Sequence, residues 1–417
     1  MSAARRARVT IVTSGHLSSC PRMLKSADAL SADGFDVHVI ATRHEPWATD
    51  TDLDVASRRS WTADTITYRR GAGGSTYWWT GARYRAARAA ASAIGPARAP
   101  LPLVSRAFGR VHTELVRAIV ADPGDLIYGG TTGALAAVAE AAAQCGTPYA
   151  LDLEDFHSGE TTGADAPLVD ALAERVEHAV LPGAVFVTAA SEAIAGAYRD
   201  RDGLASTVVH NTFALPSRAP DPARLDPDRL RIYWFSQTIG PGRGLEDAVL
   251  ALGRAGVAAS LALRGRAQAG YFEAISSMAA AHAPRVELLH LPPAPPDSMV
   301  ELSGGYDIGL SLEQMTPTNR QLCLTNKAFT YILAGAAVVI TDTPGQHALA
   351  ADLGRGAAIV PPGDLDALAG VFARWAGDPA ALACAKQTAW QAAARRWHWE
   401  HEAERGALLA LVRQALA

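Results

Sequence analysis

Residues 324–346, LTNKAFTYILAGAAVVITDTPGQ, form the most informative pattern in this chain. Their apolar side chains recur at helical spacing up to Leu333, and Gly335 stands where a helix C-cap is expected. Asn326 is expected to cap the helix, and residues 338–340 are typical of a short buried strand. Such a helix directs its unpaired N–H groups and the positive end of its dipole towards the preceding loop. The segment therefore predicts loop, helix and strand, with an anion site at the start of the helix.

Lys327 stands out in this segment because the chain strongly prefers arginine. Of the 38 basic residues 35 are arginine, and lysine occurs only at positions 25, 327 and 386. Asparagine is as rare, at positions 211, 319 and 326. A cation in the first turn of a helix opposes the helix dipole, so the pair Asn326-Lys327 suggests a bound phosphate. The alternative is a capped amphipathic helix whose lysine extends its charged end to solvent.

Length and composition predict the class of protein. At 417 residues the chain is too long for one ordinary core and fits two domains of about 200 residues each. The net charge of -4 gives no basic field for nucleic acid. The four cysteines share no metal or disulfide spacing and are expected to be reduced thiols. No stretch resembles a signal peptide or a membrane-spanning helix, so we expect a cytoplasmic protein that is soluble or peripheral at the inner face of the membrane.

The first half of the chain alternates between strand and helix patterns. Strands are predicted at residues 9–13, 37–41, 126–128, 149–153, 185–189 and 208–211, with helical segments between them. This alternation predicts an α/β fold with a parallel sheet. The loop after the first strand lacks the GxGxxG motif, which argues against NAD or FAD. Ser14 and Gly15 lie in this loop, and Arg22 and Lys25 are three residues apart on the next helix, so both can lie on one face; a solvated first turn is the alternative.

An acidic cluster, DLEDFHSGE, follows the strand at residues 149–153. It contains Asp152, Glu154, Asp155, His157 and Glu160. Open α/β sheets bind their ligands beyond the carboxyl ends of the strands, and several titratable groups at such a place indicate a site. A polar surface loop is the alternative.

The segment 65–113 contains no acidic residue but eight arginines, at positions 69, 70, 83, 85, 88, 98, 106 and 110. Trp78 and Trp79 are expected to precede an arginine-rich helix that the following prolines interrupt. Basic residues flanked by aromatic ones suit a helix at the surface of an anionic membrane, or a groove for a phosphorylated acceptor. A solvated helix whose arginines pair with acids elsewhere is the alternative.

A second domain is predicted after a polar, proline-rich linker at residues 216–227. It opens with a strand at 231–235 and the loop SQTIGPGRG, in which Gly242, Arg243 and Gly244 are suited to hold a phosphate. Strands at 260–263, 286–289 and 308–312 lead back to residues 324–346. After residue 360 the pattern is helical, with three tryptophans as apolar anchors.

The run NKAFTYILAGAAVVITDTPG resembles the nucleotide-sugar helix and strand of glycosyltransferases of the GT-B fold, family 4 type, often written NKxxEYLAAGxPVV. The runs SSCPRMLKSADALSADGFDVHV, VTAASEAIA and VVHNTF are similar to the N-terminal domain of that family, where Asn211 would close on the cleft. The resemblance implies that the acceptor binds on this side, at Ser14, Gly15, Arg22, Lys25 and Asn211. The loop SQTIGPGRG resembles its R-x-x-x-x-K-G loop, with Arg243 at the lysine position and Thr238 at the arginine position.

This sequence departs from the family pattern at two acidic donor positions, which are occupied by Thr330 and Leu322. The DLEDFH cluster resembles the family's D-x-H-E stretch, with Glu154 at the histidine position and His157 as a displaced substitute. The resemblance implies that Arg243, Lys327, Glu154, Asp155 and His157 are catalytic. It also implies donor contacts, which fall on Gly242, Gly244, Asn326, Thr330 and Thr238.

The resemblance further implies two facing Rossmann-like domains, at residues 1–215 and 216–395, and a C-terminal helix at 396–417 that crosses back to the first domain. It implies a retaining hexosyltransferase that needs no metal, with a nucleotide diphospho-sugar as co-substrate and no other cofactor. The acceptor would be a sugar, lipid-linked or small. A sugar-nucleotide epimerase, an enzyme that couples a sugar to a group other than a hydroxyl, and a non-catalytic binding protein are the alternatives.

Overall fold

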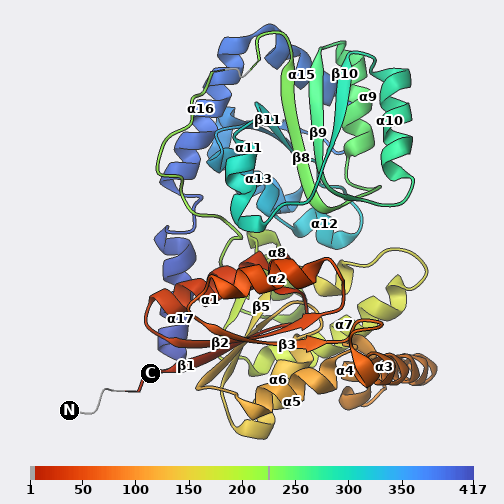
Figure 1. The fold of residues 1–417 in the computed structure, drawn as a ribbon, viewed down its shortest axis with the longest axis vertical. Helices are drawn as coiled ribbons and strands as arrows, with labels where there is room; N and C mark the ends of the chain where they lie inside the picture. Colours follow the sequence, from red (N-terminus) through yellow and green to blue (C-terminus); the bar gives the residue numbers. More distant parts are fainter. Residues whose placement is uncertain (1–4, 224–225) are drawn as a thin grey trace. The chain divides into compact units, whose positions relative to one another are not determined.

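The computed structural model describes residues 5–223 and 226–417. The chain forms two compact units (Figure 1). The first unit comprises the chain up to His210, Pro317–Asn319 and Arg405–Ala417, and the second comprises Asn211–Thr316 and Arg320–Glu404. Residues 211–215 and 396–404 group with the second unit, whereas the predicted domain limits of 1–215, 216–395 and 396–417 stay a prediction. Within 211–229 the described residues form no helix or strand, as the prolines predict.

The first unit is built on one parallel sheet with the strand order β3-β2-β1-β4-β5-β6-β7. Its strands are β1 (Arg8–Thr13), β2 (Asp36–Arg43), β3 (Thr62–Thr67), β4 (Leu126–Gly130), β5 (Tyr149–Leu153), β6 (Val187–Ala189) and β7 (Thr207–Val208). The strand predicted at 208–211 is wrong in its bounds, because β7 ends at Val208. The predicted parallel α/β sheet is confirmed.

Helices lie on both faces of this sheet (Figure 1). They are α1 (Pro21–Ala32), α2 (Ala48–Ser57), α3 (Gly74–Ile94), α4 (Leu101–Phe108), α5 (His112–Ala121), α6 (Leu135–Cys145), α7 (Ala166–Val180), α8 (Glu192–Asp202) and α17 (Ala407–Ala415). Trp78 and Trp79 lie inside α3, not before it as predicted. The C-terminal helix α17 packs against α1, where Arg413 pairs with Asp33 at 2.6 Å. The predicted return of the chain end to the first unit is therefore confirmed.

The second unit has a parallel sheet with the order β10-β9-β8-β11-β12-β13. Its strands are β8 (Leu230–Ile239), β9 (Ala259–Ala267), β10 (Val286–Leu291), β11 (Ile308–Ser311), β12 (Ala337–Thr341) and β13 (Ala357–Val360). Its helices are α9 (Leu245–Ala255), α10 (Tyr271–His282), α11 (Met299–Ser303), α13 (Asn326–Leu333), α14 (His347–Leu353), α15 (Leu365–Gly377) and α16 (Pro379–Arg395), and the short α12 (Thr318–Leu322) joins the two units.

The core of the second unit explains one of the rare lysines. Lys386 on α16 is buried, and its Nζ lies 3.2 Å from Asp307 Oδ1 and 2.7 Å from the Ala223 carbonyl. Phe329 of α13 stacks on Trp397 with ring centroids 5.7 Å apart, so one predicted tryptophan anchor is part of this core. A rare lysine in this chain can thus have a purely structural role.

Both sheets follow the doubly wound order, in which the chain builds outward from one strand and then restarts on its other side. The change of direction falls between β1 and β4 in the first unit and between β8 and β11 in the second. Loops at such a point diverge and leave a crevice at the carboxyl ends of the strands, where ligands bind. None of the described helices is long and apolar enough to cross a membrane.

Candidate functional site

Helix α13 follows the predicted bounds but not the predicted cap. The residue before the helix is Thr325, in an extended conformation and without a side-chain capping bond, whereas Asn326 is already the first helical residue. The prediction that Asn326 caps the helix is therefore wrong. Gly335 adopts a φ of 75°, the left-handed conformation that favours glycine after a helix, as predicted.

Lys327 has a partner in the protein that the sequence pattern did not predict. Its Nζ lies 3.0 Å from Oε1 of Glu313, and Arg320 Nη1 lies 2.8 Å from Oε2 of the same carboxylate. Lys327 is only 6% exposed and Glu313 only 3%. The first-turn lysine is thus stabilised by a buried carboxylate, which corrects the inference that phosphate is needed to explain it.

Glu313 lies just after β11, and both its main chain and its charged side chain have partners in the protein. Its carbonyl accepts a hydrogen bond from Thr341 Oγ1 at 2.7 Å. Burial alone would raise the pKa of Glu313, but Lys327 and Arg320 lower that pKa to about 2. The carboxylate is therefore ionised at neutral pH and contributes one negative charge to the site.

Arg243 enters the same site from the loop between β8 and α9. Gly244 adopts a φ of 71°, and a Cβ at this position would lie 2.6 Å from Leu312 Cβ, so the turn requires glycine. Arg243 Nη1 lies 3.4 Å from Ser236 Oγ. Burial and the nearby charge of Arg320 lower the pKa of Arg243, although Glu313 partly offsets them.

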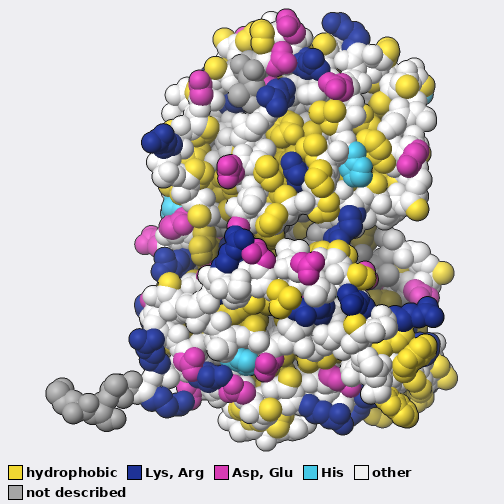
Figure 2. Space-filling model, viewed as in Figure 1, with side chains coloured by type: hydrophobic (Ala, Val, Ile, Leu, Met, Phe, Trp, Pro, Cys, Tyr) yellow, Lys and Arg dark blue, Asp and Glu magenta, His cyan; other side chains and the backbone are white. Residues whose placement is uncertain are grey.

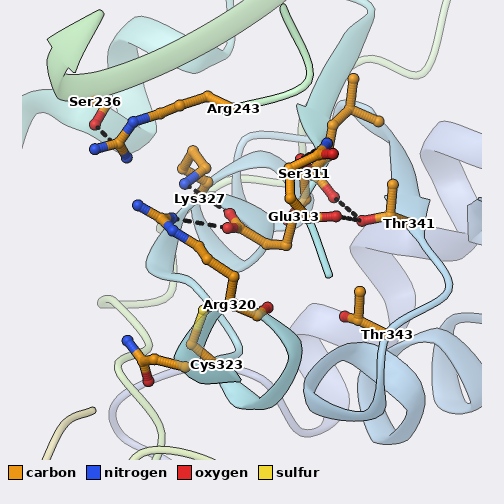
Figure 3. Close-up of polar contacts among 12 residues, drawn as sticks. Ser236, Arg243, Ser311, Glu313, Arg320, Cys323, Lys327, Thr341 and Thr343 are labelled. Carbon is orange, nitrogen blue, oxygen red and sulfur yellow. Dashed lines mark hydrogen bonds and ion pairs between the residues drawn. The ribbon is translucent and has the colours of Figure 1, made fainter. Parts of the chain in front are cut away.

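Figure 3 shows the charged ends of Arg243, Arg320 and Lys327 gathered near the Glu313 carboxylate. Together, the three cations and the one carboxylate have a net charge of +2. Arg243 comes from the loop after β8, Arg320 from α12, which follows β11, and Lys327 from α13, so they lie at the point where the strand order reverses. An anion with two or more negative charges would relieve the repulsion between Arg243 and Arg320.

Two of the predicted donor contacts have other roles. Thr330 is fully buried, and its hydroxyl donates to the Asn326 carbonyl at 2.9 Å, so no part of its side chain is exposed for the predicted donor contact. Thr238 belongs to β8 and not to the loop, because β8 continues through a bulge between Phe235 and Thr238 and pairs with Arg266. The glycine-rich loop is thus shorter than predicted.

The corresponding point of the first unit contains Ser14 and Gly15, as predicted. The Ser14 N–H donates to Thr131 Oγ1 at 2.9 Å, which ties the loop after β1 to the loop after β4. Thr131 has a φ of 74°, the one positive value among non-glycine residues in the described parts of the chain. Strained backbone of this kind concentrates at functional sites.

Arg22 does not lie where the sequence suggested. Its guanidinium donates two hydrogen bonds of 2.6 Å to the fully buried Asp152, and it also donates to the Val209 carbonyl. This bidentate pair holds α1 to β5 in the core, so Arg22 has a structural role. Asp152 has the same structural role and is therefore not part of the candidate acidic site. Lys25 lies close enough to Glu154 to lower its pKa.

The rest of the acidic cluster remains together. His157 Nδ1 lies 3.2 Å from Glu160 and 3.1 Å from Thr132 Oγ1. Burial opposes the charged imidazole, but Glu160 raises the pKa of His157 to about 9. Burial and Asp155 raise the pKa of Glu154 to about 7, and burial and Glu160 raise that of Asp155 to about 6. Glu154 and Asp155 can therefore exchange protons near neutral pH.

Asn319 completes this cluster, although the sequence pattern did not single it out. Its amide donates to Asp155 Oδ1 at 2.7 Å and accepts from the Phe156 N–H at 2.8 Å. The rarity of asparagine in this chain was the one feature of the sequence that could have indicated Asn319.

Asn211 is buried at the first position of the second unit, and its predicted acceptor role stays a prediction.

A stack of rings lies beside the Ser14 loop and was also missed. His16 stacks on His44 with centroids 4.2 Å apart, and His44 stacks on Tyr68 at 5.0 Å. Asp52 Oδ1 accepts from Ser18, while Asp52 Oδ2 and both ring nitrogens of His16 have no hydrogen-bond partner within the described structure. These residues follow β1, β2 and β3, so they share one sheet edge with the Ser14 loop.

No group of three or more described His, Cys, Asp or Glu side chains is arranged to hold a metal ion.

No protein-family model and no curated protein sequence matches the chain. Solved structures match over nearly its whole length. HepE (Alr3699) of Anabaena in complex with UDP has a TM-score of 0.67 at 17% identity, covering 98% of this chain and 99% of that one. Sucrose-phosphate synthase of Thermosynechococcus elongatus has a TM-score of 0.69 at 14% identity, with 98% and 99% covered. A candidate UDP-N-acetylglucosamine 2-epimerase of Listeria monocytogenes has a TM-score of 0.57 at 11% identity, with 98% and 96% covered. With these similarities and its two Rossmann-like sheets, the chain has the GT-B fold.

Proposed function

We propose that this protein is a glycosyltransferase that moves a sugar from a nucleoside diphosphate sugar to an acceptor hydroxyl. The observation that carries the proposal is the group of Arg243, Arg320 and Lys327 around Glu313, at the crevice of the second sheet. Its excess of positive charge suits a diphosphate, and the start of α13 adds the positive end of a helix dipole.

In the proposed reaction, the bond between the anomeric carbon and the diphosphate oxygen breaks while a bond to the acceptor oxygen forms. The diphosphate gains negative charge as it leaves, and the three cations stabilise that charge most strongly in the transition state. The acceptor proton passes to the leaving phosphate oxygen, so no side-chain nucleophile is required. This route gives retention at the anomeric carbon, as the resemblance to family 4 implies, and places no demand on a metal.

The acceptor would bind to the first unit, in a cytoplasmic enzyme. Ser14, Gly15 and Lys25 remain its proposed contacts, joined by the His16–His44 stack. Imidazole nitrogens and a carboxylate oxygen suit sugar hydroxyls, which both donate and accept hydrogen bonds. Glu154 or Asp155, whose pKa values are raised towards neutrality, would assist proton transfer at the acceptor.

The decisive experiment incubates the protein with a panel of nucleoside diphosphate sugars, first alone and then with sugar acceptors, and analyses the products by mass spectrometry. UDP-sugars are tested first because HepE was solved with UDP. Release of the nucleoside diphosphate should fall at least ~10-fold in Arg243→Ala and be retained in Arg254→Ala. Arg254 is a half-exposed arginine of the same unit that pairs with Asp366. If no nucleotide sugar is consumed and no nucleoside diphosphate binds, the proposal fails and a non-catalytic protein remains.

A sugar-nucleotide epimerase is the second candidate. The observation in its favour is the pair Glu154 and Asp155, since an epimerase needs an acid and a base with pKa values near neutral pH. The same incubation distinguishes it. An epimerase converts the donor into an isomer of equal mass without an acceptor, which chromatography resolves, whereas a transferase releases the nucleoside diphosphate.

A further inference from the structure

Helix α3 of the first unit presents large apolar side chains to solvent. Trp78 is 62% exposed and Trp79 is 71% exposed, and Ile94 at the helix end is 46% exposed. Figure 2 shows apolar side chains beside Lys and Arg side chains over this part of the first unit, at the lower right. Two adjacent tryptophans this exposed are costly in water unless another surface covers them.

The exposed residues of α3 fall on one side of the helix. They are Gly74, Ser75, Trp78, Trp79, Ala82, Arg85, Ala86, Ala89, Ser92 and Ala93, followed by Ile94 at the end of the helix. Positions 78, 82, 85, 89 and 93 are separated by three or four residues, so they share a face. Apart from the two tryptophans, Arg85 and the terminal Ile94, the exposed residues of α3 are alanines, serines and one glycine. Between Trp79 and Ile94 the helix therefore exposes few large side chains that could interlock with a protein partner.

The charge around this face is positive. Arg83 and Arg88 face acids, Glu114 at 2.6 Å and Asp165 at 3.7 Å. Arg70, in the turn before α3, and Arg85 on the helix are exposed, and within the described residues neither has an acidic partner. Because the segment 65–113 contains no Asp or Glu, nothing local neutralises them.

We propose that this face of α3, with Arg70 and Arg85, binds the surface of a membrane that contains anionic lipids. Tryptophan suits the boundary between headgroups and acyl chains because its ring is largely apolar and its N–H needs a polar partner. Guanidinium groups beside it bind lipid phosphates by paired hydrogen bonds. A flat face with two tryptophans and flanking arginines fits a lipid surface better than a protein interface, which needs about 800 Å² of shape-matched area on each side. This inference does not depend on the proposed reaction.

Co-sedimentation of the whole protein with vesicles tests the proposal. Vesicles of phosphatidylcholine alone are compared with vesicles that also contain phosphatidylglycerol, at low and high salt. We expect binding to the anionic vesicles, with loss at high ionic strength because salt screens the arginines. Arg70→Gln and Arg85→Gln should each weaken binding about fivefold. Trp78→Ala with Trp79→Ala should weaken it at least ~10-fold, since both apolar anchors are lost.

Two matched controls separate this face from the rest of the surface. Leu53→Ala removes another exposed apolar side chain, 56% exposed on α2, and Arg199→Gln removes an exposed arginine of α8. Both should bind vesicles like the wild type, and circular dichroism should show that every variant is folded. Equal binding to neutral and anionic vesicles, or no binding to either, would overturn the proposal. So would equal losses in the control variants.

Discussion

Replacing Lys327 by methionine tests both the stability and the function of the charged site. The change keeps the length of the buried side chain but removes the charge 3.0 Å from Glu313. Lowering the Glu313 pKa from 4.5 to about 2 corresponds to about 3 kcal/mol of stabilisation, at about 1.4 kcal/mol per pKa unit. Arg320 remains as a partner, so we expect Lys327→Met to cost about 2 kcal/mol, which in a unit of ~200 residues lowers Tm by about 4 to 8 °C.

The pH dependence of this loss follows from the sign of the pKa change. A carboxylate whose pKa is lowered in the folded state stabilises the protein above its unfolded pKa of 4.5 and loses that effect as the pH falls towards 2. The difference in Tm between wild type and Lys327→Met should therefore be largest near pH 7 and shrink below pH 4.5. Thermal denaturation followed by circular dichroism at several pH values measures it.

The double variant Lys327→Met with Glu313→Gln separates folding from catalysis. It contains no unpaired buried carboxylate, so its Tm should return to within about 2 °C of the wild type. Its kcat/KM should nevertheless stay at least ~10-fold below the wild type, since a charge-assisted phosphate contact contributes about 1.5 to 3 kcal/mol. Full activity in the double variant would show that Lys327 only neutralises Glu313 and that the diphosphate binds elsewhere. An unchanged Tm in Lys327→Met would refute the electrostatic reasoning.

Three further changes test other parts of the two sites. Arg243→Ala should reduce kcat/KM at least ~10-fold in a donor-consumption assay but leave Tm nearly unchanged, because burial and Arg320 already disfavour its charge. Thr330→Val should alter nucleotide affinity by less than about twofold in calorimetry, whereas Thr330→Glu should lower Tm by several degrees because its carboxylate would be buried without a partner. The raised pKa of His157 stabilises the protein below its unfolded pKa of 6.5, and this effect is lost as the pH rises through about 9. Tm should thus fall between pH 7 and 10, and Glu160→Gln should remove most of that fall; an equal fall in the variant would contradict the assignment.

Local periodicity in the sequence was sufficient to predict the parallel α/β sheets. The helix and strand of residues 324–346 and the alternating strands depend on spacing and turn residues that lie next to one another in the chain. The same information indicated Arg243 and the Ser14 loop, because both follow a predicted strand. It missed α2 and β3, whose sequences are polar and show little periodicity. The return of α17 to the first unit was implied only by the resemblance to the GT-B family.

Pairing between distant residues was decided only by the tertiary structure. Arg22 looked like a ligand contact until the fold placed it against Asp152, 130 positions away in the chain. Lys327 looked unpaired until β11 brought Glu313 and Arg320 to it, and Asp155 gained Asn319 in the same way. A sequence shows which residues carry charge, but burial and partners set whether that charge supports the core or remains available to a ligand. In the second unit, three cations that converge on one carboxylate leave an excess of positive charge, which the proposed diphosphate would balance.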